Sequence, residues 1–138
     1  MYGSIGLLDK SNQNYKTLIR CHTDSIICME YHQMHGSIIT VSRDKTIRLW
    51  SKFNFDQNVE FASPIDQPLC VAAHPNLPIF AAGFESGTMR IFDIEKTAVN
   101  DEFTQFNQHL TKMAYSPSGE LLVSVCIDGS VSLHNAAR

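Results

Sequence analysis

The 138-residue sequence has little of several features that mark particular classes of protein. Its four cysteines include no CxxC pair, and we interpret them as reduced thiols of a cytosolic protein; they are Cys21, Cys28, Cys70 and Cys126. The apolar runs are only a few residues long, too short for a transmembrane span. There is no basic excess, since 11 Lys and Arg face 14 Asp and Glu, so a general nucleic-acid or membrane-surface binder is disfavoured.

Motifs of catalysis are also missing. No Gly-x-Ser-x-Gly occurs, because Gly83-Phe84-Glu85-Ser86-Gly87 has its serine in fourth place. No Gly-rich phosphate loop opens a helix, and no pair of carboxylates stands apart from the surface charge. His32 and His35 lack a Cys or carboxylate at a zinc-like spacing, so we interpret them as surface histidines of a hairpin loop. The sequence therefore predicts no enzyme, no cofactor and no metal.

What the sequence does contain is an internal repeat. Four segments align without a gap and start 42 positions apart, at residues 2, 44, 86 and 128. In each, a hydroxyl residue stands third, an aliphatic residue or Met fourth, and Leu or Ile sixth; the segments are Tyr2–Asp9, Asp44–Ser51, Ser86–Asp93 and Asp128–Asn135. A period of about 40–45 residues is typical of a four-stranded β-propeller blade.

Short apolar runs bounded by Gly, Asp, Ser and Pro fill the rest of each unit and predict strands joined by hairpins. No segment shows sustained helical periodicity. The sequence therefore predicts an all-β fold, a partial propeller of about three four-stranded antiparallel blades and one leading strand. We divide the chain into a terminal strand of a preceding blade at 1–9 and three blades at 10–51, 52–93 and 94–138.

The first full unit resembles the WD repeat. Cys21-His22-Thr23-Asp24 stands where that family has Gly-His, and the unit closes on Trp50-Ser51 where the family has Trp-Asp. The resemblance extends over nearly the whole chain. It implies a ring of commonly about seven blades, so we expect residues 1–138 to be part of a larger propeller.

The WD signature implies a network that holds the fold together. His22, a strand hydroxyl (Ser42, or Thr40 on the same face) and the turn residue Asp44 are expected to link to the Trp50 indole and satisfy buried polar groups. The other units depart from this pattern, with Pro64, Phe84, Ser86 and Phe92 in the second and Phe106, Asp128 and His134 in the last. We predict that only the His22–Trp50 unit carries the complete network.

A narrower resemblance rests on His74-Pro75-Asn76-Leu77-Pro78 and on Gly83-Phe84-Glu85-Ser86-Gly87. These strings are similar to one region of the centriolar WD-repeat proteins of the proteome-of-centriole-sixteen type, which are large tandem-propeller proteins of centrioles and cilia. The resemblance implies a cytoskeletal location in the cytoplasm, at a ciliary or flagellar axoneme or a centriole or basal body. It also implies tubulin or microtubule-associated neighbours, although nothing here corresponds to that family's tubulin-facing domain.

In propellers, one face is formed by the loops that enter the innermost strands and by the turns after the second strands. The period puts Ser25, Gln67 and His109 in the first set and Arg43, Glu85 and Ile127 in the second, and we expect these six to form a partner-binding face. Their chemistry differs between units, as it would in a rigid scaffold with variable recognition positions. Unconstrained surface residues would vary in the same way, so both interpretations stay open.

The sequence thus predicts a non-catalytic WD-repeat scaffold that mediates protein–protein interactions in a ciliary or centriolar microtubule assembly. Its partners would be other proteins, including the rest of the propeller in the same or another chain, with no nucleic acid and no membrane. The alternative is a soluble WD-repeat adaptor, such as a ubiquitin-ligase substrate receptor or a signalling scaffold. Retention in detergent-extracted axonemes or centrioles would favour the scaffold.

Overall fold

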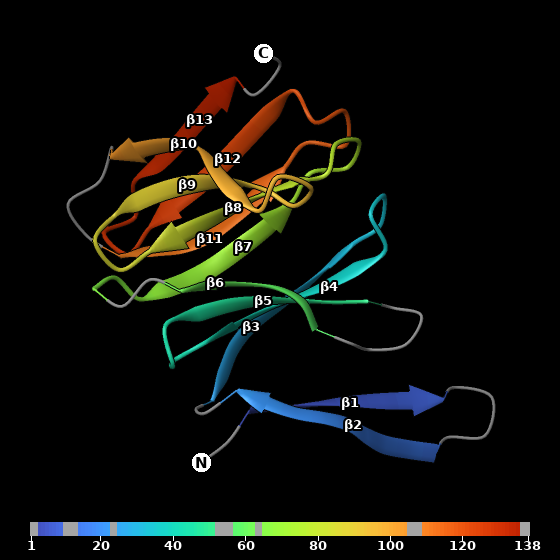
Figure 1. Cartoon of the computed structure of the whole chain (residues 1–138). Helices are drawn as coiled ribbons and strands as arrows, with labels where there is room; N and C mark the ends of the chain where they lie inside the picture. Colours follow the sequence, from blue (N-terminus) through green and yellow to red (C-terminus); the bar gives the residue numbers. More distant parts are fainter. Residues whose placement is uncertain are drawn as a thin grey trace.

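The computed structural model describes residues 3–9, 14–22, 25–51, 57–62, 65–104 and 109–135, with the backbone alone for 3–9, 14–22 and 57–58. Every regular element in these ranges is a β-strand (Figure 1), as predicted. The strands are β1 (Gly3–Asp9), β2 (Asn14–His22), β3 (Ile26–His32), β4 (Ser37–Ser42), β5 (Thr46–Ser51), β6 (Gln57–Ala62), β7 (Pro68–Ala73), β8 (Ile79–Phe84), β9 (Thr88–Asp93), β10 (Ala98–Thr104), β11 (Leu110–Tyr115), β12 (Leu121–Cys126) and β13 (Val131–Asn135). Among the described residues, no helix is long and apolar enough to cross a membrane.

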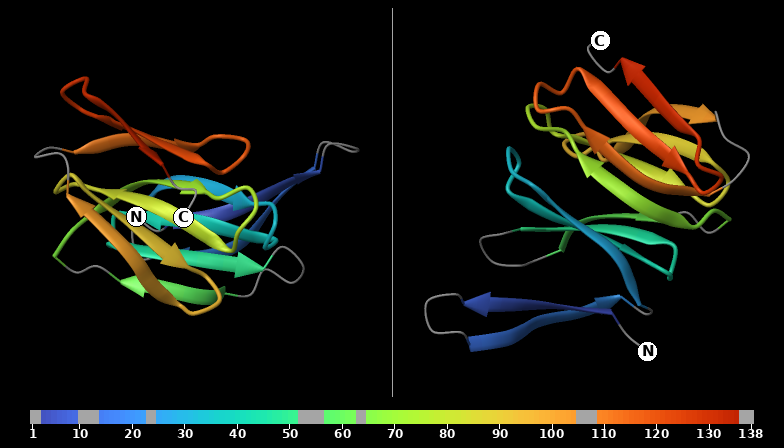
Figure 2. Two further views of the ribbon diagram at one scale, coloured as in Figure 1. Left: turned by 90° about the horizontal axis from the view of Figure 1, so that it is seen from above. Right: turned by 180° about the vertical axis from the view of Figure 1, so that it is seen from behind.

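The strands form three antiparallel sheets in the orders β3-β4-β5-β6, β7-β8-β9-β10 and β11-β12-β13, and a hairpin of β1 and β2. Figure 2 shows the sheets as successive layers, with the hairpin at one end and the β11–β13 sheet at the other. All pairings are antiparallel, because strands that follow one another within a sheet are joined by short connections that return the chain beside itself.

The sheets are offset from the repeat units by one strand. Each unit at 10–51, 52–93 and 94–138 begins with its outer strand, but β6 pairs with β5 and β10 pairs with β9. The outer strand of a unit therefore completes the sheet of the unit before it. For the same reason, β1 does not stand alone but pairs with β2, and the described part of the last sheet has three strands where a four-stranded blade was expected.

The first two sheets pack face to face through an apolar cluster. It contains Ile39, Val41, Ile47, Leu49, Val71, Phe80, Ala82, Phe84, Phe92 and Ile94. The rings of Phe80 and Phe92 stack with centroids 5.0 Å apart. A second cluster joins the second and third sheets through Cys70, Ala72, Ala81, Met89, Ile91, Leu110, Met113 and Leu122. Each fully buried large side chain contributes about 1.5–3 kcal/mol to folding, so these two joints hold the layers together.

Gly83 marks the closest approach at the second joint. A Cβ at this position would lie 2.7 Å from Cys70 Sγ and 2.9 Å from Leu110 Cβ. The positions 42 residues before and after it carry Val41 and Val125. The second sheet therefore needs glycine here because Leu110 and Cys70 occupy the space that a side chain would fill.

One sheet face stays open in the described structure. Ile39, Val41, Ile47 and Leu49 are covered by the second sheet, and their equivalents in the second sheet are covered by the third. The equivalents in the third sheet are aliphatic too, and Val123 faces Leu133 while Val125 faces Val131 across the strands. Val131 is 66% exposed and Leu133 is 62% exposed. This face has the composition of a packed joint without a covering layer.

Candidate protein-interaction face

The six predicted face positions are brought together in three pairs by one repeated hydrogen bond. The amide of Arg43 donates to the carbonyl of Ser25 over 2.9 Å. Glu85 donates in the same way to Gln67 over 2.8 Å, and Ile127 to His109 over 2.9 Å. The β4–β5, β8–β9 and β12–β13 turns consequently lie on the same side of the three sheets (Figure 1).

The six positions do not all offer a side chain to a partner. Arg43, Glu85, His109 and Ile127 are exposed. Gln67 instead donates from Nε2 to the carbonyl of Ser42 over 2.7 Å, which ties the second sheet to the first. The Ser25 carbonyl also accepts a hydrogen bond from the Ser42 hydroxyl over 2.9 Å. Ser25 and Gln67 therefore brace the face, and the other four form its surface.

Each turn on this face is closed by a side-chain oxygen that accepts a hydrogen bond from the amide two residues later. Asp44 Oδ1 accepts from the Thr46 amide over 2.9 Å, and Asp128 Oδ1 from the Ser130 amide over 2.8 Å. Hydrogen bonds from Ser130 hold the pKa of Asp128 below its usual range. In the second turn the Ser86 hydroxyl replaces the carboxylate and accepts from the Thr88 amide over 3.3 Å. Such local bonds fix the turn conformation.

The Trp50 indole is buried in the first sheet and donates from Nε1 to Thr40 Oγ1 over 3.0 Å. Thr40 was the alternative to Ser42 in the predicted network. Ser42 Oγ donates to Ser25 and accepts from the amide of Asp44 over 3.2 Å. The side chain of His22 lies outside the described residues, as do Pro64 and Phe106, so the network through His22 stays a prediction.

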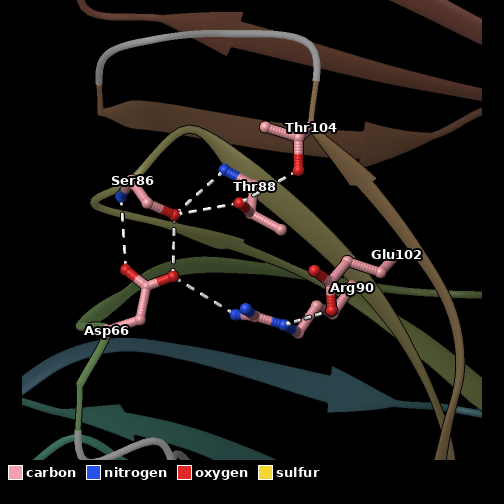
Figure 3. Close-up of polar contacts among 6 residues, drawn as sticks. All are labelled: Asp66, Ser86, Thr88, Arg90, Glu102 and Thr104. Carbon is pink, nitrogen blue, oxygen red and sulfur yellow. Dashed lines mark hydrogen bonds and ion pairs between the residues drawn. The ribbon is translucent and has the colours of Figure 1, made fainter.

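The second sheet has a different network, which the sequence analysis missed (Figure 3). The Asp66 carboxylate accepts from the amide of Ser86 over 3.2 Å and from its hydroxyl over 2.7 Å, and it pairs with Arg90 Nη1 at 3.3 Å. Arg90 also pairs through Nε with Glu102 at 3.1 Å, and its guanidinium lies 4.4 Å from the centre of the Phe84 ring. The network joins the loop before β7 to the β8–β9 turn and to strands β9 and β10.

The repeat contained the signal for this network. Arg48 and Glu60, 42 positions before Arg90 and Glu102, form the same cross-strand ion pair at 2.8 Å. Asp66 follows Asp24 by the same 42 positions. Comparing every polar position along the period, rather than the family signature alone, would have singled out this set. Asp66 supplies from the loop the carboxylate that the second turn lacks at Ser86.

The interpretation of His32 as a surface histidine is wrong. Its side chain is fully buried at the end of β3, where Nε2 donates to the carbonyl of Ile79 over 2.9 Å. His35 is half-buried and its Nδ1 lies 2.6 Å from Ser37 Oγ. In the part of the chain that the structure describes, no three or more His, Cys, Asp or Glu residues gather in a way that could hold a metal ion.

The face presents three chemically different turns on identical backbone supports. Arg43 and Lys45 make the first turn cationic, Glu85 makes the second anionic, and Ile127 is 59% exposed on the third beside Asp128. The networks below hold these turns in place. Such an arrangement can display several recognition groups at fixed spacing, which is the chemistry of a binding surface.

Layered, four-stranded antiparallel sheets with a 42-residue period define a β-propeller architecture. The chain belongs to the WD-repeat family, since the family model described as "WD domain, G-beta repeat" matches residues 12–51 and 101–135. The two matched ranges leave out 52–100, which contains Asp66, Ser86 and Arg90 of the second network. The sequence resemblance to the WD repeat is thereby confirmed.

Three relatives illustrate the sequence similarity. The chain is 40% identical to WD repeat-containing protein 90 of Xenopus tropicalis over 96% of its length and 36% identical to the human protein of that name over 98%. It is 28% identical to echinoderm microtubule-associated protein-like 4 of Xenopus laevis over 92%. The chain spans only 7%, 8% and 14% of these three proteins.

Solved structures support the fold alone. The structure of U3-55K superposes with a TM-score of 0.80 at 22% identity, covering 86% of this chain and 38% of the other. The crystal structure of RRP9 WD40 repeats gives a TM-score of 0.80 at 22% identity, with 86% and 37% covered.

Proposed function

We propose that this chain is part of a non-catalytic scaffold in a ciliary or centriolar microtubule assembly. It binds neighbouring proteins through the face that carries the β4–β5, β8–β9 and β12–β13 turns, which we call the turn face. The observation that supports the binding role is a backbone hydrogen bond that recurs in each of the three sheets. It holds the amides of Arg43, Glu85 and Ile127 in equivalent places, and the side chains of these residues differ in charge and polarity. A constant support under variable side chains suits recognition.

The microtubule assignment draws its support from relatives. One of them carries the name of a microtubule-associated protein, and the similarity extends over 92% of this chain. The sequence resemblance to centriolar tandem-propeller proteins points in the same direction. A scaffold also agrees with the open aliphatic face at Val131 and Leu133. An exposed apolar sheet face on rigid layers is stabilised when another layer covers it and removes it from water.

The test uses the native-length protein that carries this chain. After detergent extraction of ciliated cells, we expect the protein to remain with axonemes or centrioles. The double substitution Arg43→Ala and Glu85→Ala removes one charge of each sign from the face, and we expect it to lower retention about tenfold, the effect of losing one anchoring contact. Thermal unfolding should be unchanged, because both side chains are exposed.

A matched control removes the same charges from the opposite side of the sheets. Glu95 and Lys96 are exposed in the turn between β9 and β10, and their double alanine variant should be retained like the wild type. Equal retention of both variants would clear the turn face of a binding role. Complete extraction of the wild type into the soluble fraction would instead favour the soluble adaptor.

A further inference from the structure

Two buried histidines occupy equivalent places on the side of the sheets opposite the turn face. His32 ends β3 and His74 follows β7, and they stand 42 positions apart. His32 is 0% exposed and His74 is 4% exposed. The turns that follow β3, β7 and β11 lie together on one side of the layers (Figure 1). Neither histidine takes part in the networks under the turn face.

Each histidine joins its own turn to the next sheet. His32 Nε2 donates to the carbonyl of Ile79 over 2.9 Å, and His74 Nε2 donates to the carbonyl of Gly119 over 3.2 Å. His32 Nδ1 accepts from the amide of His35 over 3.1 Å. In the turn between β7 and β8, His74 Nδ1 lies 3.0 Å from the amide nitrogens of both Asn76 and Leu77. We call these two arrangements the histidine clasps.

The bonding partners determine the form of both rings. A carbonyl at Nε2 requires a proton on that nitrogen, and an amide N–H at Nδ1 requires a free lone pair. Only the neutral imidazole with its proton on Nε2 meets both demands. A second proton on Nδ1 would face an amide hydrogen and remove the bond inside the turn. Each clasp therefore closes only around a neutral ring.

The surroundings compensate only partly for a second proton, because burial outweighs the backbone carbonyls that favour the charged rings; these are the carbonyls of Ile79 and Leu77 at His32 and of Gly119 at His74. Among the described groups that act electrostatically on the rings, His35 opposes the charging of His32, and His32 opposes the charging of His74. The Tyr115 ring of β11 lies 4.8 Å from that of His74. Gly119 packs tightly against the second ring, since a Cβ there would lie 2.4 Å from His74 Cε1.

We propose that the histidine clasps form an acid-sensitive device that couples each sheet to the next and loosens the two joints when the pH falls. Burial lowers the pKa of both His32 and His74. A histidine of lowered pKa binds its proton more readily in the opened state. The clasps are therefore intact above the ordinary histidine pKa of about 6.5 and weaken as the pH falls below it.

Hydrogen exchange followed by mass spectrometry on the native-length protein tests the device. After correction for intrinsic exchange rates, the segments 32–37 and 74–79 should lose protection about tenfold between pH 7.5 and 5.5, as for the loss of one hydrogen bond. The turns at 43–46 and 85–88 provide an internal control, because their amides donate to backbone carbonyls and to Asp and Ser side chains. Unchanged protection in the clasp segments would overturn the proposal.

The variant His32→Gln with His74→Gln keeps a donor near each Nε2 but cannot titrate. We expect its clasp segments to exchange at the same corrected rate at both pH values. The exposed His109→Gln change serves as the matched control and should keep the wild-type response. A wild-type response in the double variant would also overturn the proposal. If the double variant fails to fold, the wild-type exchange measurement still decides.

Discussion

Asp66 and Arg90 form an ion pair of 3.3 Å that connects the loop before β7 to the middle of β9. The pair stands in the sheet that has Phe92 where the first sheet has Trp50. Both side chains are largely shielded from water, so their attraction is screened less than that of a surface pair. The second blade thus stabilises its turn by a route that the WD signature does not describe.

The Asp66→Ala substitution should lower the free energy of unfolding by about 1–3 kcal/mol, because it removes the carboxylate that accepts from Arg90 Nη1 and from the Ser86 amide. Urea unfolding measures this loss. Asp101→Ala, an exposed acid on β10, is the control and should change stability by less than about 0.5 kcal/mol. Similar losses in the two variants would show that the Asp66 network contributes little.

Two buried hydroxyls at equivalent positions should respond in opposite ways to their removal. Thr40→Val removes the acceptor of the 3.0 Å hydrogen bond from the buried Trp50 N–H and should cost about 1–3 kcal/mol. Ser124 stands 84 positions later, and its Oγ is buried without a hydrogen-bond partner among the described residues. Ser124→Ala should therefore be neutral or stabilising. Thermal unfolding of both variants checks the contrast, and equal losses would argue against the indole bond.

Gly83→Ala should destabilise the joint between the second and third sheets by about 1–3 kcal/mol, because the new methyl group would overlap Cys70 Sγ and Leu110 Cβ. Cys70→Ala removes the Sγ that would lie 2.7 Å from the new methyl group and so creates space at the same place. In a double-mutant cycle measured by urea unfolding, the combined variant should lose less stability than the sum of the single changes. Strict additivity would mean that the two positions do not compete for space.

The open aliphatic face should promote self-association of the isolated 138-residue chain. Val131→Ser together with Leu133→Ser should raise the monomer fraction in size-exclusion chromatography with light scattering. Ile65→Ser is the control, since Ile65 is 96% exposed on a loop away from that sheet face. If the wild-type chain is already monodisperse, or if the control has the same effect as the double variant, the open face does not drive association.

The period of 42 residues was enough to predict most of the fold. Strand positions followed from apolar runs and turn residues, since alternation and tight turns are local properties of the chain. The pairing of outer strands did not follow, because β6 pairs with β5 of the preceding unit, and a repeat period does not show at which strand one sheet ends and the next begins. The period groups the face positions into two sets of equivalents, and the structure adds that a member of one set bonds to a member of the other, for example Arg43 to Ser25.

The roles of particular side chains were harder to foresee. The repeat predicts Gln67 on the face, but its side-chain amide donates to the carbonyl of Ser42 in the adjacent sheet. The sequence predicts His32 as a surface residue, but its side chain is fully buried. Both depend on a neighbouring sheet whose distance and angle are absent from the sequence. Asp66 and Arg90 meet across 24 positions of chain for the same reason.

By itself, the sequence determined the class of this protein: an all-β chain of repeated four-stranded units with the WD signature in one of them. Those properties rest on periodicity, turn chemistry and composition, which act along the chain. Only the tertiary structure decided which polar groups meet across the layers, which of the six face residues are exposed, and that two histidines bridge the joints. Those outcomes depend on how sheets stack, because packing brings together atoms that no local interaction along the chain relates.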